Sequence, residues 1–260
     1  MTADQASFLA PAGPRILAHR GLSTAAPENT LLAFLHALAN GATHLETDVH
    51  ATSDGVAVIS HDPTLAAGGA AVNRLTMAQL ARIDLGQGQT YCSLAEALDA
   101  FPEARFNIDV KSADAVVPTA RAIRAVGAGR RVLLTSFSET RRRRVLRAVP
   151  GAATSASAQG IALMLAAVAL RQHWALPRIL RGVSAIQVPE RAGRLRVVTP
   201  AVITRMHRIG VEVHVWTVNE PARMRRLLGL GVDGLVTDRY DLAARVVGSR
   251  GRDGAHDAGF

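Results

Sequence analysis

Residues 44–62 read HLETDVHATSDGVAVISHD, and this stretch decides how the strands of the chain are counted. Two β-rich runs, His44–His50 and Val56–Ser60, are joined by a short segment that ends in Asp54-Gly55. Asp-Gly between two such runs predicts a tight turn, so the second run folds back on the first as a hairpin. Setting that hairpin strand aside leaves eight strand candidates: Arg15–His19, His44–His50, Arg105–Val110, Val132–Ser136, Ala153–Ala156, Ala185–Val188, Glu212–Thr217 and Gly234–Thr237.

Longer helical segments separate these strands. Their apolar residues recur every three or four positions, as an amphipathic helix requires. The candidates are Thr30–Asn40, Ser93–Ala100, Ala115–Val126, Glu139–Ala148, Ile161–Trp174, Pro200–Ile209 and Pro221–Leu228. Strand followed by helix, repeated, predicts a parallel sheet with helices outside, and eight parallel strands are the number in a (β/α)8 TIM barrel.

The predicted domain organisation is one α/β barrel domain over residues 1–248. A Gly-containing segment at about residues 50–92, after the second strand, is expected to be a small insertion on the loop face. Residues 249–260 are rich in Gly, Arg and Asp and are predicted to be disordered. A chain of 260 residues suits this organisation, because α/β barrels often form a single domain of about 200–250 residues.

Composition indicates a globular cytoplasmic protein. Apolar residues make up 48% of the chain, enough for a sizeable core. The single cysteine, Cys92, excludes an intramolecular disulfide and is expected to be buried and inert. The first residues do not have the pattern of a signal peptide. The most apolar run, Ile161–Leu170, is shorter than the ~20 residues that span a bilayer.

The charge distribution is uneven. The net charge is +9, with −6 in residues 1–110 and +15 in residues 111–260, and Lys111 is the only lysine. A basic half can contact nucleic acid or an anionic membrane. Aromatic residues are only 4% and are not interleaved with basic ones, so we expect no nucleic-acid partner and mostly solvated arginines. Transient contact with an anionic membrane stays open. A second hypothesis that stays open is a non-catalytic, anion-binding protein on a barrel scaffold. Such a protein would bind DNA in a salt-dependent way and would hydrolyse nothing.

Ionisable residues gather at predicted strand ends, where a barrel builds its active site. Glu46 and Asp48 lie two residues apart and face the same side of their strand, as do Asp109 and Lys111. If the two strands are neighbours, three carboxylates converge. A hard divalent cation, Mg²⁺ or Ca²⁺, would neutralise them. The alternative is a structural ion pair with a nearby arginine.

Two histidines complete a possible catalytic set. His19 ends the first strand and His61 follows the hairpin strand, and both are candidates for general acid and base. Arg20 and Lys111 would supply positive charge beside the carboxylates. Cations, a metal and two proton-transferring groups suit a phosphate ester, because they stabilise phosphoryl oxygens and move protons.

The chain resembles the glycerophosphodiester phosphodiesterase family in an ordered series of motifs between about residues 15 and 245. Single motifs are unspecific, whereas the ordered set is specific. The matching stretches are His19-Arg20-Gly21, Pro27-Glu28-Asn29-Thr30, Gly41-Ala42, Glu46-Thr47-Asp48-Val49, Thr52 with Asp54-Gly55, Ser60-His61-Asp62, Asn107-Ile108-Asp109-Val110-Lys111, Val215-Trp216-Thr217-Val218-Asn219, Gly231-Val232-Asp233-Gly234 and Thr237-Asp238.

This resemblance implies a (β/α)8 barrel with an insertion after the second strand and a metal-dependent phosphodiesterase of lipid and glycerol metabolism. The implied substrate is a small glycerophosphodiester, such as glycerophosphocholine, which is cleaved to glycerol 3-phosphate and an alcohol. The implied roles are acid and base for His19 and His61, metal ligation for Glu46, Asp48 and Asp109, phosphate contact for Arg20 and Lys111, and a glycerol-side pocket wall for Trp216. Attack by water and attack by the glycerol 2-hydroxyl, through a cyclic phosphate, both stay open.

Asp109 departs from the family pattern, in which the third metal ligand is most often Glu. Barrel phospholipases of the sphingomyelinase D type are similar and have Asp at this position. An intact lysophospholipid is therefore the alternative substrate. Two residues of the matched motifs have a simpler expected role, because Asn29 or Thr30 can cap the helix that begins near Leu31.

Overall fold

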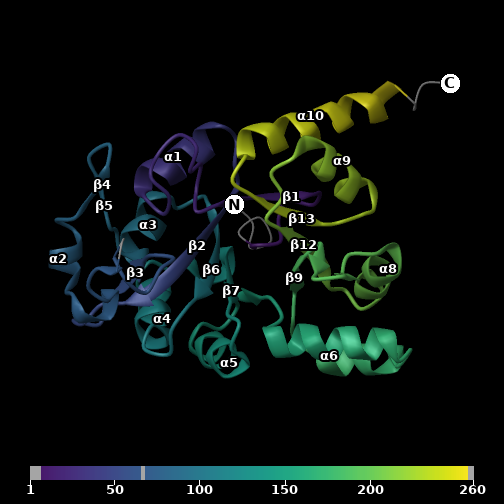
Figure 1. The fold of residues 1–260 in the computed structure, drawn as a ribbon, viewed down its shortest axis with the longest axis horizontal. Coiled ribbons are helices and arrows are strands. Elements are labelled where there is room, and N and C mark those ends of the chain that lie inside the picture. The colour runs from purple at the N-terminus through teal and green to yellow at the C-terminus, as the bar shows by residue number, and fades with distance from the viewer. Residues whose placement is uncertain (1–6, 66–67, 257–260) are drawn as a thin grey trace.

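The computed structural model describes residues 7–65 and 68–256, with side chains described as far as residue 248. Eight parallel strands form the barrel and helices surround it (Figure 1). The strands are β1 Arg15–His19, β2 His44–Ala51, β6 Arg105–Val110, β7 Val132–Thr135, β8 Ala153–Thr154, β9 Ala185–Pro189, β12 Glu212–Trp216 and β13 Gly234–Thr237. They are hydrogen-bonded in the order β8-β7-β6-β2-β1-β13-β12-β9, and a parallel bridge between Ser155 and Ala185 connects the two ends. The predicted TIM barrel is confirmed.

The helices follow the strands as the alternation predicts. They are α1 Leu31–Ala39, α2 Met77–Leu80, α3 Leu94–Ala100, α4 Val116–Ala125, α5 Glu139–Ala148, α6 Ala158–Ala169, α7 Leu176–Ile179, α8 Pro200–Arg208, α9 Pro221–Gly229 and α10 Tyr240–His256, with short 3₁₀ turns at Val72–Arg74, Ala128–Arg131 and His173–Ala175. Helix α6 begins three residues earlier than predicted and ends before Trp174. The early end coincides with Arg171, whose φ of 56° is left-handed and incompatible with a continuing helix.

Side-chain caps set where several helices begin. Thr30, Ser93 and Ser157 each accept a hydrogen bond from the backbone N–H three residues later, at the starts of α1, α3 and α6. Removing such a cap typically costs about 1 kcal/mol of stability. Of the two residues proposed to cap α1, Thr30 is therefore the cap, and Asn29 is free for another role.

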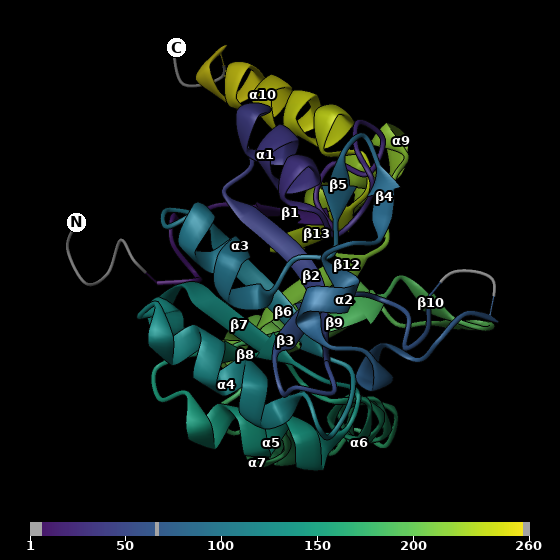
Figure 2. The ribbon, with the colours of Figure 1, turned by 90° about the vertical axis from the view of Figure 1, so that its left-hand side faces the viewer.

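The predicted hairpin and insertion lie between β2 and α3. Strand β3, Ala57–Ile59, pairs antiparallel with β2 across a turn in which Gly55 has a φ of 75°. The insertion continues through α2 and a small hairpin, β4 Asp84–Gly86 with β5 Gln89–Thr90. A second hairpin, β10 Arg191–Ala192 with β11 Leu195–Arg196, follows β9 and projects from the barrel (Figure 2).

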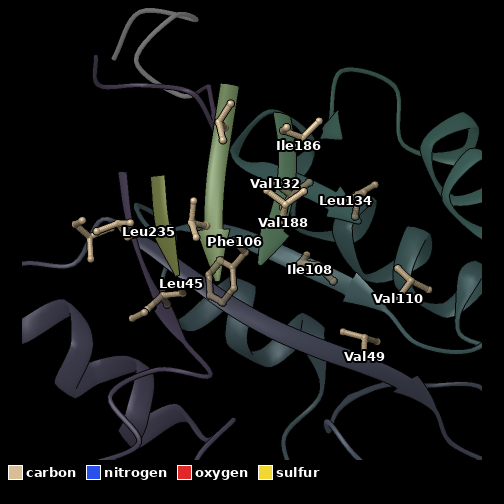
Figure 3. Packing of buried hydrophobic residues seen from close by; sticks show 14 of the residues in the cluster. Leu45, Val49, Phe106, Ile108, Val110, Val132, Leu134, Ile186, Val188 and Leu235 are labelled. Atoms are coloured by element: carbon tan, nitrogen blue, oxygen red, sulfur yellow. The ribbon is translucent and has the colours of Figure 1, made fainter. Parts of the chain in front are cut away.

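The two faces of the strands have different compositions. Outward-facing apolar residues, among them Leu45, Phe106 and Ile186, form the large core beneath the helices (Figure 3). The barrel interior has a small apolar cluster built from Phe8, Leu17, Leu133, Ala185 and Val236. Polar groups line much of the rest, including His44, Glu46, Asp48, Asn107, Asp109 and His214, all buried. Hydrophobic stabilisation thus comes mainly from outside the barrel, and the interior is available for chemistry.

Phe8 is buried among strand residues of the barrel and packs on His44. The two rings meet edge to face with their centroids 5.0 Å apart. His44 Nε2 donates to the Phe8 carbonyl at 2.8 Å, which leaves Nδ1 to accept from the Thr43 hydroxyl at 2.9 Å. Burial lowers the pKa of His44 to about 3, so the imidazole is neutral in the folded protein.

Helix α10 packs on α9 and β1 and extends to His256. Residues 249–256, which the sequence predicts to be disordered, are therefore helical, and residues 257–260 lie outside the described residues. The glycines of this tail lower helix propensity, but a helix already nucleated by the packed residues before it extends at small cost. Within residues 7–65 and 68–256, no helix is both long enough and apolar enough to cross a membrane.

Candidate active site

A cavity of about 560 Å³ opens at the carboxyl end of the barrel strands. Its lining includes every site residue predicted from the sequence: His19, Arg20, Glu46, Asp48, His61, Asp109, Lys111 and Trp216. Barrel register explains why they meet. Strand β2 pairs with β1 on one side and with β6 on the other, so that Glu46 lies beside His19, and Asp48 lies beside Asp109.

The chain turns sharply after His19. Arg20 and Gly21 both have left-handed backbones, with φ of 55° and 84°. A Cβ on Gly21 would lie 2.6 Å from the backbone of Ala33, so only glycine fits at this position. The Arg20 N–H donates to the Glu46 carbonyl at 3.0 Å. This turn fixes His19 and Arg20 at the edge of the cavity.

His19 is held by a half-buried carboxylate, Asp238, whose side chain is 34% exposed. Its Nδ1–H donates to Asp238 Oδ1 at 2.6 Å, and Asn219 Nδ2 donates to Asp238 Oδ2 at 2.8 Å. Burial opposes protonation of His19, but the hydrogen bond to Asp238 and the charge of Glu46 outweigh it and raise the histidine pKa. The hydrogen bond from His19 lowers the pKa of Asp238. The other ring nitrogen, Nε2, lies 3.8 Å from Glu46 Oε2 and is available for proton transfer.

His61 has a similar but more exposed arrangement. Its Nδ1 lies 2.8 Å from Asp62 Oδ1, and the His61 and Asp62 side chains are 39% and 73% exposed. His50 Nε2 donates to the His61 carbonyl at 3.2 Å, which fixes the backbone there. Both histidines thus have a carboxylate on one ring nitrogen and line the same cavity.

Lys111 lies between two carboxylates. Its Nζ is 2.8 Å from Asp48 Oδ1 and 2.8 Å from Asp109 Oδ2. Burial opposes the ammonium, but the charges of Asp109 and Asp48 outweigh it and raise the lysine pKa. Arg20 Nε lies 3.3 Å from Asp48 Oδ2, and Asn29 Nδ2 donates to the same oxygen at 3.3 Å. Asp48 therefore pairs with the charges of Lys111 and Arg20 and accepts a hydrogen bond from Asn29.

Glu46 and Asp109 are both buried carboxylates whose pKa values are raised. Burial, with the neighbouring Asp48 charge, raises the pKa of Glu46. Burial also raises the pKa of Asp109, despite the opposing charge of Lys111. Two buried oxygens, Asp109 Oδ1 and Asn107 Oδ1, have no hydrogen-bond partner. Since unpaired buried acceptors are costly, this region is suited to receive a further cation or donor.

The oxygen donors fit a hard divalent cation, the group for which carboxylate and amide oxygens are suited. In the part of the chain that the structure describes, no three His, Cys, Asp or Glu side chains are grouped as a metal-binding cluster. The Lys111 ammonium instead takes the place between Asp48 and Asp109. A metal held by Glu46, Asp48 and Asp109 would require these side chains to turn toward one another.

The opposite wall of the cavity is apolar. It comes from β7 and the segments that follow it, and includes Phe137, Ile161, Leu165, Val188, Pro189 and Trp216. Phe137 is 64% exposed and Trp216 is 38% exposed. The cavity thus has a charged half, from β1, β2, β6 and the hairpin, and an apolar half.

Comparison with known proteins gives the family of this chain. The model of the glycerophosphoryl diester phosphodiesterase family matches residues 19–242. The chain belongs to this family. It is therefore a phosphoric diester hydrolase, and the non-catalytic anion-binding barrel considered from the charge distribution is excluded.

Individual members of the glycerophosphoryl diester phosphodiesterase family match over nearly the whole chain. A Mycobacterium tuberculosis protein named probable glycerophosphodiester phosphodiesterase 2 is 42% identical, over 97% of this chain and 98% of that protein. A Caldanaerobacter subterraneus glycerophosphodiester phosphodiesterase is 27% identical, over 86% and 93%. The crystal structure of the Agrobacterium tumefaciens glycerophosphodiester phosphodiesterase has 26% identity and a TM-score of 0.74, covering 90% of this chain and 99% of that one.

Three residues that contact the predicted site residues are not identified by the sequence motifs as part of the site. Asp238 and Asn219 hold His19, and Asn29 binds Asp48. The register pairs Ala18 with Thr237, so the next residues, His19 and Asp238, fall side by side. The barrel topology, in which the last strand pairs with the first, is the signal that identifies Asp238. Asn29 has no such signal, because its capping role is equally compatible with the sequence.

Proposed function

We propose that the protein hydrolyses glycerophosphodiesters to glycerol 3-phosphate and an alcohol, with a divalent cation, Mg²⁺ or Ca²⁺, and with His19 and His61 as acid and base. The observation that carries the proposal is the charged half of the cavity. Two histidines, each hydrogen-bonded to a carboxylate, line it together with Lys111 and Arg20. Family membership supplies the reaction class.

In this mechanism the phosphodiester lies between the two histidines. Arg20 and Lys111 exchange part of their contacts with Asp48 for the phosphoryl oxygens and stabilise the charge that builds there. One histidine takes a proton from the attacking oxygen, and the other gives a proton to the leaving alcohol oxygen. Asp238 keeps the proton on Nδ1 of His19, so Nε2 is the nitrogen that exchanges protons. Attack by water and attack by the glycerol 2-hydroxyl use the same pair.

The proposed metal ligands are Glu46, Asp48 and Asp109. A bound divalent cation polarises the phosphoryl group and activates the attacking oxygen. The unpartnered Asp109 Oδ1 supports this assignment, because it is a buried oxygen without a hydrogen-bond donor. Asp109 is one methylene shorter than the Glu usual in the family, and it would still offer a carboxylate oxygen to such a cation.

The test is hydrolysis of glycerophosphocholine by the purified protein, followed as release of glycerol 3-phosphate and choline. Activity should require Mg²⁺ or Ca²⁺ and disappear with EDTA. His19→Ala and His61→Ala should each lose about 10²–10⁴-fold in kcat with unchanged circular dichroism, the usual contribution of acid–base catalysis. His36→Ala, on helix α1 and outside the cavity lining, is the matched control. Near-normal turnover of either cavity variant would contradict the acid–base assignment.

We also propose transient contact with anionic membranes through the outer face of α6 and the turn after it. Leu163, Leu170 and Trp174 are 50%, 67% and 77% exposed there, and Arg171 lies among them. Exposed apolar side chains beside a cation favour an anionic lipid surface. The protein should cosediment with anionic vesicles at low salt, and Leu170→Ser with Trp174→Ser should weaken this. If the protein does not cosediment with anionic vesicles at low salt, the proposed membrane contact is wrong.

The proposed location is the cytoplasm. The one cysteine, Cys92, is free and buried, and burial raises the pKa of its thiol to about 12. A protein without disulfides is suited to a reducing compartment. Fractionation of cells with an antibody against the protein would test this location.

A further inference from the structure

A second cavity adjoins the active-site cavity. Its volume is about 440 Å³, and its lining consists of Pro189, Glu190, Arg191, Trp216, Arg223 and Arg226. Pro189 and Trp216 also line the active-site cavity, and they pair in register where β9 and β12 end. The two cavities therefore meet at these two residues, so one ligand can extend from the first into the second. We call the second one the arginine cavity.

The arginine cavity has an excess of positive charge. Three of its lining residues are arginines and one is a glutamate, and three positive charges against one negative leave a net charge of +2. In the active-site cavity, by contrast, Arg20 and Lys111 face three carboxylates. Arg223 Nη1 also lies 3.8 Å from a carboxylate of Glu220, but that side chain is 69% exposed, so solvent weakens the pair. A bound anion would balance the remaining charge.

Glu190 holds two of the arginines in place. Its Oε2 lies 2.7 Å from Arg226 Nη2 and 3.4 Å from Arg223 Nη2. Burial opposes ionisation of Glu190, but hydrogen bonds from both arginines outweigh it and lower the glutamate pKa. The Glu190 carbonyl accepts from the N–H groups of Val197 and Val198 at 3.1 and 3.3 Å, which fixes Glu190 at the base of the β10–β11 hairpin. The two guanidinium groups are thus ordered in advance, which lowers the entropic cost of binding an anion.

The geometry of these arginines suits a phosphate group. Arg223 and Arg226 lie three residues apart on α9 and therefore share one face of the helix. A guanidinium has five N–H donors, and the contact with Glu190 uses only the Nη2 end of each. The side chains are 39% and 44% exposed, so both guanidinium groups are open to solvent. Their planar forks of N–H groups match the spacing of phosphate oxygens.

We propose that the arginine cavity binds a second phosphate group of the substrate, so that the substrate is a glycerophosphodiester whose glycerol carries a further phosphodiester. This inference rests on the proposed function and adds its substrate class. The site predicted from the sequence has Trp216 beside the glycerol, and the arginine cavity begins at Trp216. A phosphate on the far hydroxyl of that glycerol lies beyond Trp216, beside Arg223 and Arg226. The phosphate that is cleaved lies between the two histidines.

The simplest such substrate is bis(glycerophospho)glycerol, in which three glycerols are joined by two phosphodiesters. Its central glycerol would lie at Trp216, with one phosphate in the arginine cavity and the other at the histidines. Water adds across the bond between the phosphorus at the histidines and the oxygen of the terminal glycerol. The phosphorus gains the water oxygen, and the terminal glycerol leaves with a proton. The first products are free glycerol and a glycerophosphoglycerol that carries a phosphate monoester. Binding in the opposite direction would release glycerol 3-phosphate first.

The experiment compares bis(glycerophospho)glycerol with glycerophosphoglycerol, which has a single phosphodiester. Each exposed ion pair is worth roughly 1.4- to 5-fold in binding. Two arginines should therefore raise kcat/KM of the two-phosphate substrate about two- to thirtyfold over that of the one-phosphate substrate. At early conversion the two-phosphate substrate should release glycerol in excess of glycerol 3-phosphate. Because salt screens exposed charges, the advantage in kcat/KM should shrink as the salt concentration rises, and an advantage that salt does not change would contradict binding by the arginines.

A double variant, Arg223→Gln with Arg226→Gln, tests the arginine cavity itself. Its matched control is Arg208→Gln with Arg225→Gln, which removes the same charge from exposed positions outside the lining of both cavities. The ratio of kcat/KM for the two-phosphate substrate to that for the one-phosphate substrate should fall about two- to thirtyfold in the first double variant and stay constant in the control. An equal fall in both would assign the preference to overall charge and overturn the inference.

The substrate comparison separates this inference from the proposed function and needs no variant. If glycerophosphoglycerol is hydrolysed but the unmutated enzyme does not prefer the two-phosphate substrate, the second-phosphate inference is wrong and the proposed function stands. An arginine cavity that takes only free phosphate would give this result. Glycerol 3-phosphate as the main first product of the two-phosphate substrate would also overturn the inference. If neither substrate is hydrolysed, both the inference and the proposed function fail.

Discussion

Replacement of Asp238 by asparagine removes the charge that holds His19 while preserving the size of the side chain. Asp238 Oδ1 accepts the His19 Nδ1–H at 2.6 Å, and Asn219 fixes the other oxygen at 2.8 Å. A neutral amide binds the imidazole less strongly and stabilises its protonated form less. We expect Asp238→Asn to lower kcat with little change in KM, because Asp238 acts through His19 and does not line the cavity.

The expected size of the loss comes from the strength of this contact. A hydrogen bond to a charged group contributes about 1.5–3 kcal/mol. At about 1.4 kcal/mol per factor of ten, this predicts a loss of roughly 10- to 150-fold in kcat. Asp62→Asn is the matched comparison, since Asp62 binds His61 in the same way but is 73% exposed. Exposed ion pairs contribute about 0.2–1 kcal/mol, which predicts a loss of less than about sixfold.

The assay is steady-state choline release from glycerophosphocholine, with thermal unfolding of each variant as the folding control. A kcat for Asp238→Asn within threefold of the unmutated enzyme would refute the positioning argument. A larger loss for Asp62→Asn than for Asp238→Asn would refute the reasoning from burial, even if both variants were impaired.

Three further predictions follow from the electrostatics of the barrel. Because His44 has a pKa of about 3 when folded, below the ordinary 6.5, the unfolded state binds the extra proton. His44 therefore lowers the free energy of unfolding as the pH falls below about 6.5, by about 2 kcal/mol near pH 5. In urea unfolding between about pH 7.5 and 5, the free energy of unfolding of His44→Gln should fall by about 2 kcal/mol less than that of the unmutated protein. Equal pH dependence in both proteins would contradict this. Lys111→Arg should lower kcat/KM at least tenfold in the choline assay, because the ammonium fits between carboxylates 2.8 Å away on each side and a guanidinium is wider. Unimpaired activity would count against that fit. Mg²⁺ or Ca²⁺ at 100 times its Kd should stabilise the fold by about 2.7 kcal/mol in thermal unfolding. Asp48→Asn and Asp109→Asn should abolish the shift, and an equal shift in these variants would place the ion elsewhere.

The barrel architecture is predictable because the strand count depends on local signals. The Asp54-Gly55 turn removes one strand from the parallel set, and the remaining strands have alternating helices. The burial of Phe8 is not predictable in the same way, since it depends on contacts with strands that lie far away in the sequence. The extension of α10 into the glycine-rich tail is not predictable either. It depends on the packing of the first turns of α10 against the rest of the protein, and helix propensity does not include that packing.

The sequence likewise predicts one part of the candidate site and leaves another part undetermined. Strand-end carboxylates and histidines identify the charged half of the cavity, because parallel strands bring their carboxyl ends to one face. The pairing of Lys111 with both Asp48 and Asp109 depends on side-chain positions across two strands, which sequence spacing does not determine. The apolar half of the cavity also cannot be predicted from the spacing of residues in the sequence. The apolar residues of α6 occur on its buried, cavity-facing and exposed sides alike.

The alternation along β2 has a consequence for how this enzyme can change. Leu45 and Val49 contribute to the core beneath the helices, whereas Glu46 and Asp48 face the cavity. Neighbouring residues of one strand therefore serve separate ends, stability at Leu45 and Val49 and reactivity at Glu46 and Asp48. A substitution at Glu46 or Asp48 can alter the chemistry of the cavity while the hydrophobic contacts of Leu45 and Val49 remain in place.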